Sequence, residues 1–336
     1  MSIFLNLMFM LILILIAAQI FCDALEHLGE RLKISEGVTG SLFAAVGTAL
    51  PETLVPLLAI FAGTDNISIN EEIGVGAILG APLMLSTLSL SLLAVFTLKK
   101  RGINGSFTPE KTGLTRDLNF FLLAFLLAAV ALFIPHDFSA VRTGIAFSLV
   151  LVYFVYIMLT LRASAQLVQK GHGTATQAPM FLCRLGLPDN TAVTLLQLLV
   201  GLGLLVAGAK GFIHGVEEAA PIIGISALLL SLLIIPLATE LPEKVNSILW
   251  IRKGKDTLAF GNITGAMVFQ GTLLPAIGVM LTPWEARYEV LFGILITLLA
   301  ALWLRVLLLR GNLKVWHLAI NGLFYIIYLA IILSFI

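Results

Sequence analysis

Long apolar runs constrain the fold of this chain more than any other feature. Ten runs come close to, or exceed, the roughly 20 apolar residues that a helix needs to cross a bilayer. They cover residues 3–22, 36–62, 72–98, 117–134, 139–161, 191–213, 219–250, 257–281, 287–308 and 313–335. Only 12% of the 336 residues are charged, which is about half the share in a soluble domain. A membrane β-barrel would show short alternating segments instead. The sequence therefore predicts an all-α membrane protein with ten transmembrane helices.

The positive charges fall mostly on one side of this arrangement. Of the 20 Lys and Arg residues, 16 lie in the loops after the odd-numbered runs, 3 lie on the other side, and Lys244 lies inside the seventh run. Cytoplasmic loops are the basic ones. We expect a multi-pass protein of the cell (inner) membrane with both termini extracytoplasmic. The sequence has no basic tail or basic-aromatic stripe of the kind that binds nucleic acid, so the expected partners are the lipid bilayer and inorganic cations. The oligomeric state stays open.

Two motifs occur twice, in the same order. GTALPET at 47–53 is matched by ATELPEK at 238–244. Farther along each half, VGAILGAPLML at 75–85 is matched by FGNITGAMVFQ at 260–270. Both of the later segments contain a G-xxx-G pattern, which by itself indicates close helix packing. The order and spacing together predict an internal repeat.

The repeat divides the chain into three parts. Residues 1–162 form a first five-helix repeat, residues 163–190 a polar cytoplasmic linker, and residues 191–336 a second five-helix repeat. Because five is an odd number, the two repeats must enter the membrane in opposite senses. Inverted-topology repeats of this kind are typical of secondary transporters.

The two Pro-Glu pairs predict broken helices at the second and seventh positions. A proline within a helix removes one hydrogen bond and frees the carbonyl four residues back, here through Pro51 and Pro242. A carboxylate at membrane depth is costly, so it should face the protein interior and serve a function. Equivalent helices of inverted repeats meet near the bilayer midplane, which predicts one cation site shared by Glu52 and Glu243. The alternative is that each Glu only caps the half-helix that follows it.

Neutral oxygens accompany both acids. Thr48 and Thr239 lie four residues before Glu52 and Glu243, on the same helix face. Hard cations such as Ca²⁺ bind six to eight oxygen ligands. The hydroxyl groups therefore complete the pattern of a cation site.

At these residues the sequence resembles a known family. GTALPE and ATELPE resemble the G-T-S-L-P-E signatures of the Ca²⁺:cation antiporter superfamily, of the sodium/calcium exchanger type. The resemblance implies that helices 2, 3, 7 and 8 surround the ions while helices 1 and 6 slide past them. It implies acidic, hydroxyl and carbonyl ligands at six positions, namely Glu52, Glu243, Thr48, Thr239, Ala45 and Pro236.

The sequence also departs from the family pattern. The motif serine is replaced by Ala49 and by Glu240, and the late Asn/Asp positions are Leu85 and Gln270. These changes reduce the number of family sodium ligands that are present in this sequence. Glu240 adds a third carboxylate, which favours exchange of protons in place of sodium through a coupled group of acids. The equal alternative is a salt bridge from Glu240 to Lys244, one turn along the helix.

The expected function is secondary active antiport of Ca²⁺, or a related cation, against Na⁺ or H⁺. The expected cation ligands include Glu240 and Gln270 besides the six positions above, and no cofactor is expected. The alternative is a non-transporting membrane protein of the exchanger fold, with a degraded ion site and a scaffold or regulatory role. No nucleophile–base constellation and no HExxH motif is present, so an enzyme is not expected.

Overall fold

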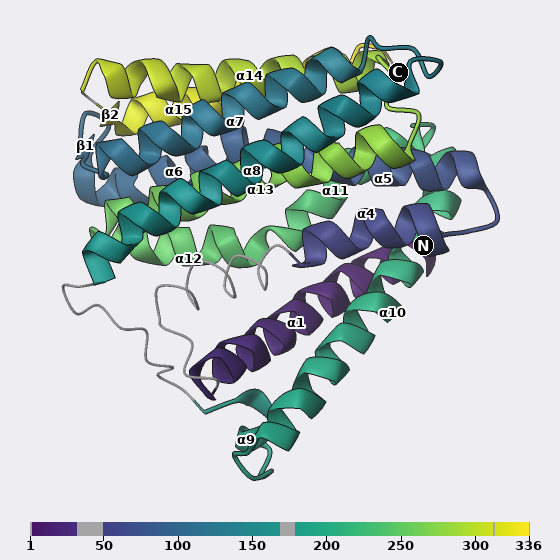
Figure 1. The fold of residues 1–336 in the computed structure, drawn as a ribbon, viewed down its shortest axis with the longest axis horizontal. Coiled ribbons are helices and arrows are strands. Elements are labelled where there is room, and N and C mark those ends of the chain that lie inside the picture. Colours follow the sequence, from purple (N-terminus) through teal and green to yellow (C-terminus); the bar gives the residue numbers. More distant parts are fainter. Residues whose placement is uncertain (1, 32–49, 169–178, 312, 336) are drawn as a thin grey trace.

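The computed structural model describes residues 2–31, 50–168, 179–311 and 313–335, and almost all of them are helical (Figure 1). The described residues up to 168 contain α1 (Ser2–Arg31), α4 (Leu50–Ala62), α5 (Ile67–Met84), the π-helix η2 (Leu85–Ser89), α6 (Leu90–Arg101), β1 (Ser106–Phe107), α7 (Lys111–Ala131) and α8 (Ser139–Val168). The remainder contains α9 (Phe181–Arg184), α10 (Thr191–Ile223), α11 (Ala227–Thr239), α12 (Leu241–Arg252), α13 (Asp256–Leu281), α14 (Tyr288–Leu309), β2 (Leu313–Lys314) and α15 (Val315–Leu333).

Within the described residues, eight helical segments are long and apolar enough to cross a membrane, and Glu52–Ala62 and Ala227–Leu237 are shorter apolar helices. The chain is therefore a multi-pass membrane protein. The segment Ile67–Arg101 is 78% buried in the protein, whereas Ser139–Thr160 is only 17% buried. A helix that is buried all round belongs to the interior of a bundle, so α5, with 13 buried residues, lies centrally and α8 lies at the periphery.

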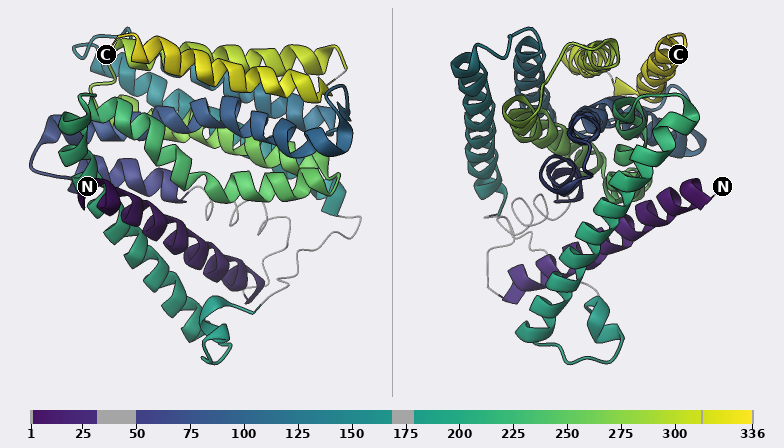
Figure 2. Two further views of the ribbon diagram at one scale, coloured as in Figure 1. Left: turned by 180° about the vertical axis from the view of Figure 1, so that it is seen from behind. Right: turned by 90° about the vertical axis from the view of Figure 1, so that its right-hand side faces the viewer.

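The helices α1 and α10 lie side by side and cross the direction of the remaining bundle (Figures 1 and 2). Glycines of α10 allow the close approach. A Cβ atom at Gly201 would lie 2.9 Å from the backbone of Phe21, and one at Gly208 would lie 2.9 Å from Ile14. Small residues at a helix interface permit such backbone contact in membranes.

A second glycine contact joins α5 to α11. A Cβ atom would lie 2.0 Å from the Ser231 hydroxyl if placed at Gly76, and 2.1 Å from the Leu232 carbonyl oxygen if placed at Gly80. The first G-xxx-G pattern is thus a packing surface. The described residues form two large hydrophobic clusters, and apolar side chains of α5 and α11 belong to both. One cluster is shared with α1, α4 and α10. The other is shared with α6–α8 and α13–α15. These two helices form the layer between the crossing pair and the rest.

The seventh apolar run is interrupted at Glu240. The helix α11 ends at Thr239 and α12 begins at Leu241, with Glu240 at φ −88° and ψ 5° between them. Pro242 lies in the first turn of α12, where its missing N–H costs no hydrogen bond. The predicted break in the seventh helix is therefore present. The matching break predicted from Pro51 involves the carbonyl of Gly47, which lies outside the described residues, so it stays a prediction.

The helix α10 continues ten residues beyond the predicted end at 213, to Ile223. Exposed Lys210, His214 and Glu218 recur every four residues on one side, while Val216 is buried on the other. The helix thus becomes amphipathic where the apolar run ends, and it stops at Gly224, which adopts the left-handed conformation (φ 79°). Glycine is favoured at such a helix end.

Several basic loops meet at one end of the bundle. The strands β1 and β2 pair antiparallel, with Ser106 opposite Lys314. Nearby, Arg101 makes hydrogen bonds of 2.8 and 2.5 Å to the two carboxylate oxygens of Asp256. The loops that follow α6, α12 and α14 therefore lie together (Figure 1).

Candidate functional site

Glu52 is a buried carboxylate in the first turn of α4, with 3% of its surface exposed. The N-terminus of a helix favours a negative charge, and the following turns place Val55 and Ala59 in the apolar cluster shared with α1 and α10. The side chain of Glu52 is therefore directed into the protein and not toward lipid. An acid in this setting is either a helix cap or a functional group.

Three other predicted ligands lie wholly or partly outside the described structure. Ala45 and Thr48 fall within residues 32–49. The backbone of Glu243 belongs to the first turn of α12, but its side chain is not among those described. The meeting of Glu52 and Glu243 thus stays a prediction.

Glu240 and Gln270 are in contact at the helix interruption. Glu240 is fully buried, and one of its carboxylate oxygens accepts a hydrogen bond of 2.7 Å from the Gln270 side-chain amide. Gln270 lies on α13 and is 2% exposed. The hydrogen bond gives the buried carboxylate a polar partner within the protein. Two of the predicted site residues are brought together, from α13 and from the break between α11 and α12.

Thr239 and Pro236 end the helix α11 beside this acid. The Thr239 hydroxyl is 2% exposed and donates to the Ile235 carbonyl at 3.2 Å. The Pro236 carbonyl accepts the backbone N–H of Glu240 at 3.2 Å. It also accepts a hydrogen bond of 3.1 Å from the ammonium group of Lys244. The oxygen is therefore shared between a backbone donor and a buried cation.

Lys244 is buried at the same place, with 3% of its surface exposed. Besides the Pro236 carbonyl, its Nζ lies 2.9 Å from the Met84 sulfur. The sequence indicated Glu240 as a partner for Lys244 because the two are one turn apart. It contained no signal for the contacts with Pro236 and Met84, because both arise from the reach of the Lys244 side chain toward the end of α11 and toward α5.

The corresponding place in the first repeat is less polar. Leu85, which matches Gln270, is fully buried in the apolar core. Ser86 and Thr87 both donate their hydroxyl hydrogens to the Leu83 carbonyl, at 3.2 and 2.5 Å. They lie in η2, and π-helical turns are frequent at functional sites. The candidate site is therefore asymmetric between the halves.

A further buried acid, Asp117, was not singled out from the sequence. It lies on α7 and accepts hydrogen bonds from the Thr264 hydroxyl at 2.7 Å and the Tyr156 hydroxyl at 3.1 Å. These contacts join α7, α8 and α13. The sequence feature that could have identified it is the position of an aspartate at the start of the apolar run 117–134. The hydrogen bonds on both carboxylate oxygens indicate a structural tie.

An ion-pair network joins α5, α11 and α14. Arg287 donates to Glu72 at 2.5 Å and to Glu289 at 3.2 Å, and Glu72 accepts the Leu228 backbone N–H at 3.2 Å. Burial works to lower the pKa of Arg287, but its hydrogen bond and ion pair with Glu72 outweigh this and leave the pKa above its ordinary value. Arg287 thus stays charged and holds the ends of three helices.

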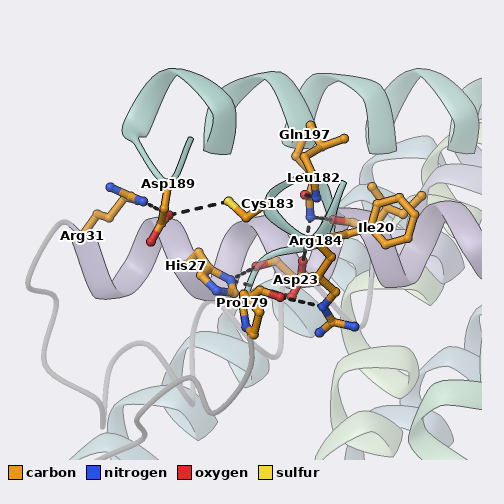
Figure 3. A network of polar contacts seen from close by, with 11 residues as sticks. Ile20, Asp23, His27, Arg31, Pro179, Leu182, Cys183, Arg184, Asp189 and Gln197 are labelled. Carbon is orange, nitrogen blue, oxygen red and sulfur yellow. Dashed lines mark hydrogen bonds and ion pairs between the residues drawn. The ribbon is translucent and has the colours of Figure 1, made fainter. Parts of the chain in front are cut away.

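A third polar network fixes α9 to the crossing pair (Figure 3). Asp23 of α1 accepts the Phe181 N–H at 2.8 Å and the Gln197 amide at 2.7 Å. Gln197 of α10 in turn accepts the Leu182 N–H at 2.8 Å. Buried polar groups that satisfy one another specify a unique packing. The contacts join α1, α9 and α10 into one unit.

Among the described residues, no three His, Cys, Asp or Glu side chains come together as a metal-binding group. Within the described residues, Glu240, Gln270, Thr239 and Lys244 lie together at the interruption between α11 and α12, and Glu52 is a further buried acid at the start of α4. Oxygen atoms of this kind suit hard cations.

Comparison with known proteins gives consistent matches. The "Putative antiporter CaxA" of Alkalimonas amylolytica is 26% identical over 281 residues, covering 81% of this chain and 79% of that protein. The inner membrane protein YrbG of Escherichia coli is 26% identical over 275 residues, covering 82% of this chain and 78% of that protein.

Solved structures share the fold. An H⁺/Ca²⁺ exchanger CAX superposes with a TM-score of 0.72 at 19% identity, over 98% of this chain and 82% of that one. The sodium-calcium exchanger NCX_Mj superposes with a TM-score of 0.59 at 19% identity, over 97% of this chain and 96% of that one. The model of the sodium/calcium exchanger protein family matches residues 2–162 and 193–334. The chain therefore belongs to the sodium/calcium exchanger protein family, whose members are transporters and not enzymes.

Proposed function

We propose that this protein is a secondary active antiporter that moves Ca²⁺, or a related cation, against Na⁺ or H⁺. The observation that carries the proposal is the burial of Glu52, 3% exposed, within the repeated Pro-Glu motif of an exchanger-family chain. A carboxylate at membrane depth is retained where it binds a cation or a proton. Glu243 of the second repeat supplies the facing carboxylate.

The proposed architecture has ten spans in two inverted repeats, residues 1–162 and 191–336, joined by the linker 163–190. The two segments matched by the family model, 2–162 and 193–334, support this division. The meeting of basic loops at one end of the bundle supports a cytoplasmic position for that end. Both termini then lie outside the cell (inner) membrane.

The proposed ligands combine both halves of the chain. Glu52 and Glu243 bind the cation directly, with the hydroxyl groups of Thr48 and Thr239 and the carbonyl groups of Ala45 and Pro236. Glu240, held by Gln270, supplies a further negative charge beside them. No cofactor takes part, because the transported ions are themselves the cargo.

Alternating access follows from the layered packing. The pair α1 and α10 packs against α4, α5 and α11 through an apolar cluster of its own. Apolar contacts are non-directional and therefore offer little resistance to sliding. The pair is thus suited to move past the site and expose it on alternate sides, which is the gating that inverted repeats permit.

The choice of counter-ion is the finer part of the proposal. Solved relatives of this fold are described as exchangers of H⁺ for Ca²⁺ and of sodium for calcium. Leu85 offers no oxygen where the family pattern has an Asn or Asp, which weakens a sodium site and favours H⁺. Flux of radioactive Ca²⁺ in proteoliposomes, with separate pH and Na⁺ gradients, assigns the counter-ion.

The same assay tests the site. We expect Glu52→Gln and Glu243→Gln each to abolish Ca²⁺ flux without loss of folded protein, because a neutral amide cannot balance the charge of the ion. Glu218→Gln, at an exposed position of α10, is the matched control and should retain flux. Normal flux in either site variant would refute the proposal.

The second candidate function is a non-transporting protein of the exchanger fold. The apolar Leu85 in the place of a ligand favours it. A ligand that binds only the native state must raise its stability. Absence of any thermal stabilisation by Ca²⁺, Na⁺ or a change of pH in the purified protein would therefore select this candidate.

A further inference from the structure

Lys244 places a positive charge within the site proposed for a cation. The residue lies in the first turn of α12, and helical side chains point back toward the N-terminus of their helix. That direction carries its four-carbon stem across the interruption at Glu240 and onto the end of α11. Its Nζ reaches the Pro236 carbonyl oxygen at 3.1 Å and the Met84 sulfur at 2.9 Å.

The surroundings hold this ammonium group in a defined position. Pro236 cannot easily move away, because Gly80 of α5 packs so closely that a Cβ atom there would lie 2.7 Å from the Pro236 ring. Met84 is 1% exposed and Glu240 is fully buried. An ammonium ion taken out of water costs several kcal/mol unless polar groups replace its hydration shell. The Pro236 carbonyl oxygen, an expected ligand of the transported cation, therefore stabilises the ammonium group of Lys244.

The Pro236 carbonyl oxygen has no lone pair left over for another cation. A backbone carbonyl has two lone pairs, and this one accepts both the Glu240 N–H at 3.2 Å and the Lys244 ammonium. In the function proposed above, the same oxygen is a ligand of the transported cation. The two cations compete for it.

We propose that Lys244 is a tethered cation of the transport site, which occupies the Pro236 carbonyl between transport events and gives it up when the mobile cation arrives. This inference rests on the proposed function. It identifies Lys244 as the residue that lowers cation affinity and sets how much mobile charge the site accepts.

Charge-neutral variants separate this role from a structural one. Lys244→Met removes both the charge and the hydrogen bond, whereas Lys244→Gln removes the charge but keeps an N–H donor. Lys244→Arg keeps the charge. Lys210→Gln, which removes a lysine charge at an exposed position of α10, is the matched control.

Equilibrium binding of Ca²⁺, and separately of Na⁺, to the purified full-length protein in detergent measures the effect. A like charge a few ångströms away opposes binding strongly at the low dielectric of a protein. We expect Lys244→Met and Lys244→Gln to bind about tenfold more tightly than wild type or better, since a tenfold change needs only about 1.4 kcal/mol. Lys244→Arg and Lys210→Gln should stay close to wild type.

The outcomes distinguish this inference from the function on which it rests. If wild type binds Ca²⁺ and Glu52→Gln does not, but both neutral Lys244 variants bind no more tightly than wild type, only the inference is overturned. Weaker binding by Lys244→Met with wild-type binding by Lys244→Gln would reveal a purely structural hydrogen bond and also overturn it. If neither wild type nor any variant binds either ion, both proposals fall. If Lys244→Met does not fold, Lys244→Gln decides alone.

Discussion

At the scale of single residues, the contact between Gln270 and Glu240 is the most informative. It joins α13 to the interruption between α11 and α12 through a hydrogen bond of 2.7 Å on a fully buried carboxylate. Hydrogen bonds to charged groups are the stronger ones in proteins. The second half of the chain thus fixes an acid through Gln270, whereas the residue that matches Gln270 in the first half is the apolar Leu85 of η2.

The contact predicts a measurable loss of stability. We expect Gln270→Leu to lower the free energy of unfolding by about 1–3 kcal/mol, because it removes a partner from a buried carboxylate. Gln19→Leu, at an exposed position of α1, is the matched control and should change little. Unfolding in detergent provides the measurement. A double-mutant cycle with Glu240→Gln should give a coupling energy clearly different from zero, and additive effects would contradict the contact.

The sequence identifies Glu240 and Gln270 as separate candidate ligands but does not predict the contact between them. Glu240 and Gln270 were each predicted as ligands from their positions in the repeated motifs. Lys244 was weighed only against Glu240, and Asp117 was not considered. The contacts of Lys244 with Met84, and of Asp117 with Thr264, join positions 160 and 147 residues apart. Local periodicity contains no information about such distant pairs.

At the scale of elements, prolines and glycines decide the geometry of the site. Pro242 starts α12 directly after the interruption, and Gly76 and Gly80 let α5 approach α11 at backbone distance. A side chain at either glycine would force these helices apart. Since Pro236 and Lys244 lie at the same crossing, the packing of α5 on α11 also positions the site.

This packing gives a prediction for glycine variants. We expect Gly80→Ala to destabilise the protein by about 1–3 kcal/mol, because overpacking against a backbone carbonyl 2.1 Å away forces a shift of the helix. Gly144→Ala in α8 is the control, since no described atom lies within 4 Å of a Cβ there. Alanine should be neutral or slightly stabilising at that position. Equal melting temperatures for Gly80→Ala and wild type would contradict the close approach.

The helices themselves were largely predictable from the sequence, and their ends were not. Each apolar run overlaps a helix in the described residues, and Pro242 correctly located the break in the seventh run. The end of α10 was predicted ten residues too early. Polar residues on one side of the helix end the apolar run, although the other side of the same helix remains buried. The π-helix at 85–89 also escaped prediction, since its residues fit an ordinary α-helix equally well.

At the scale of the whole molecule, the packing separates a crossing pair from a central bundle (Figure 2). The pair α1 and α10 is joined to α9 by the contacts of Asp23 and Gln197, so these elements move together if they move at all. The bundle is tied across its ends by Arg287 with Glu72 and by Arg101 with Asp256. This distribution of ties is the one expected for a transporter in which the pair slides past a fixed site.

The central claim is that Glu52 and Glu243, from oppositely oriented halves, share one cation. The most direct test is anomalous diffraction from crystals of this protein soaked with Sr²⁺, an electron-rich substitute for Ca²⁺. We predict one strong peak within coordination distance of both carboxylates, and its loss in Glu52→Gln crystals. A peak elsewhere in the bundle, or carboxylates too far apart to share an ion, would contradict the account.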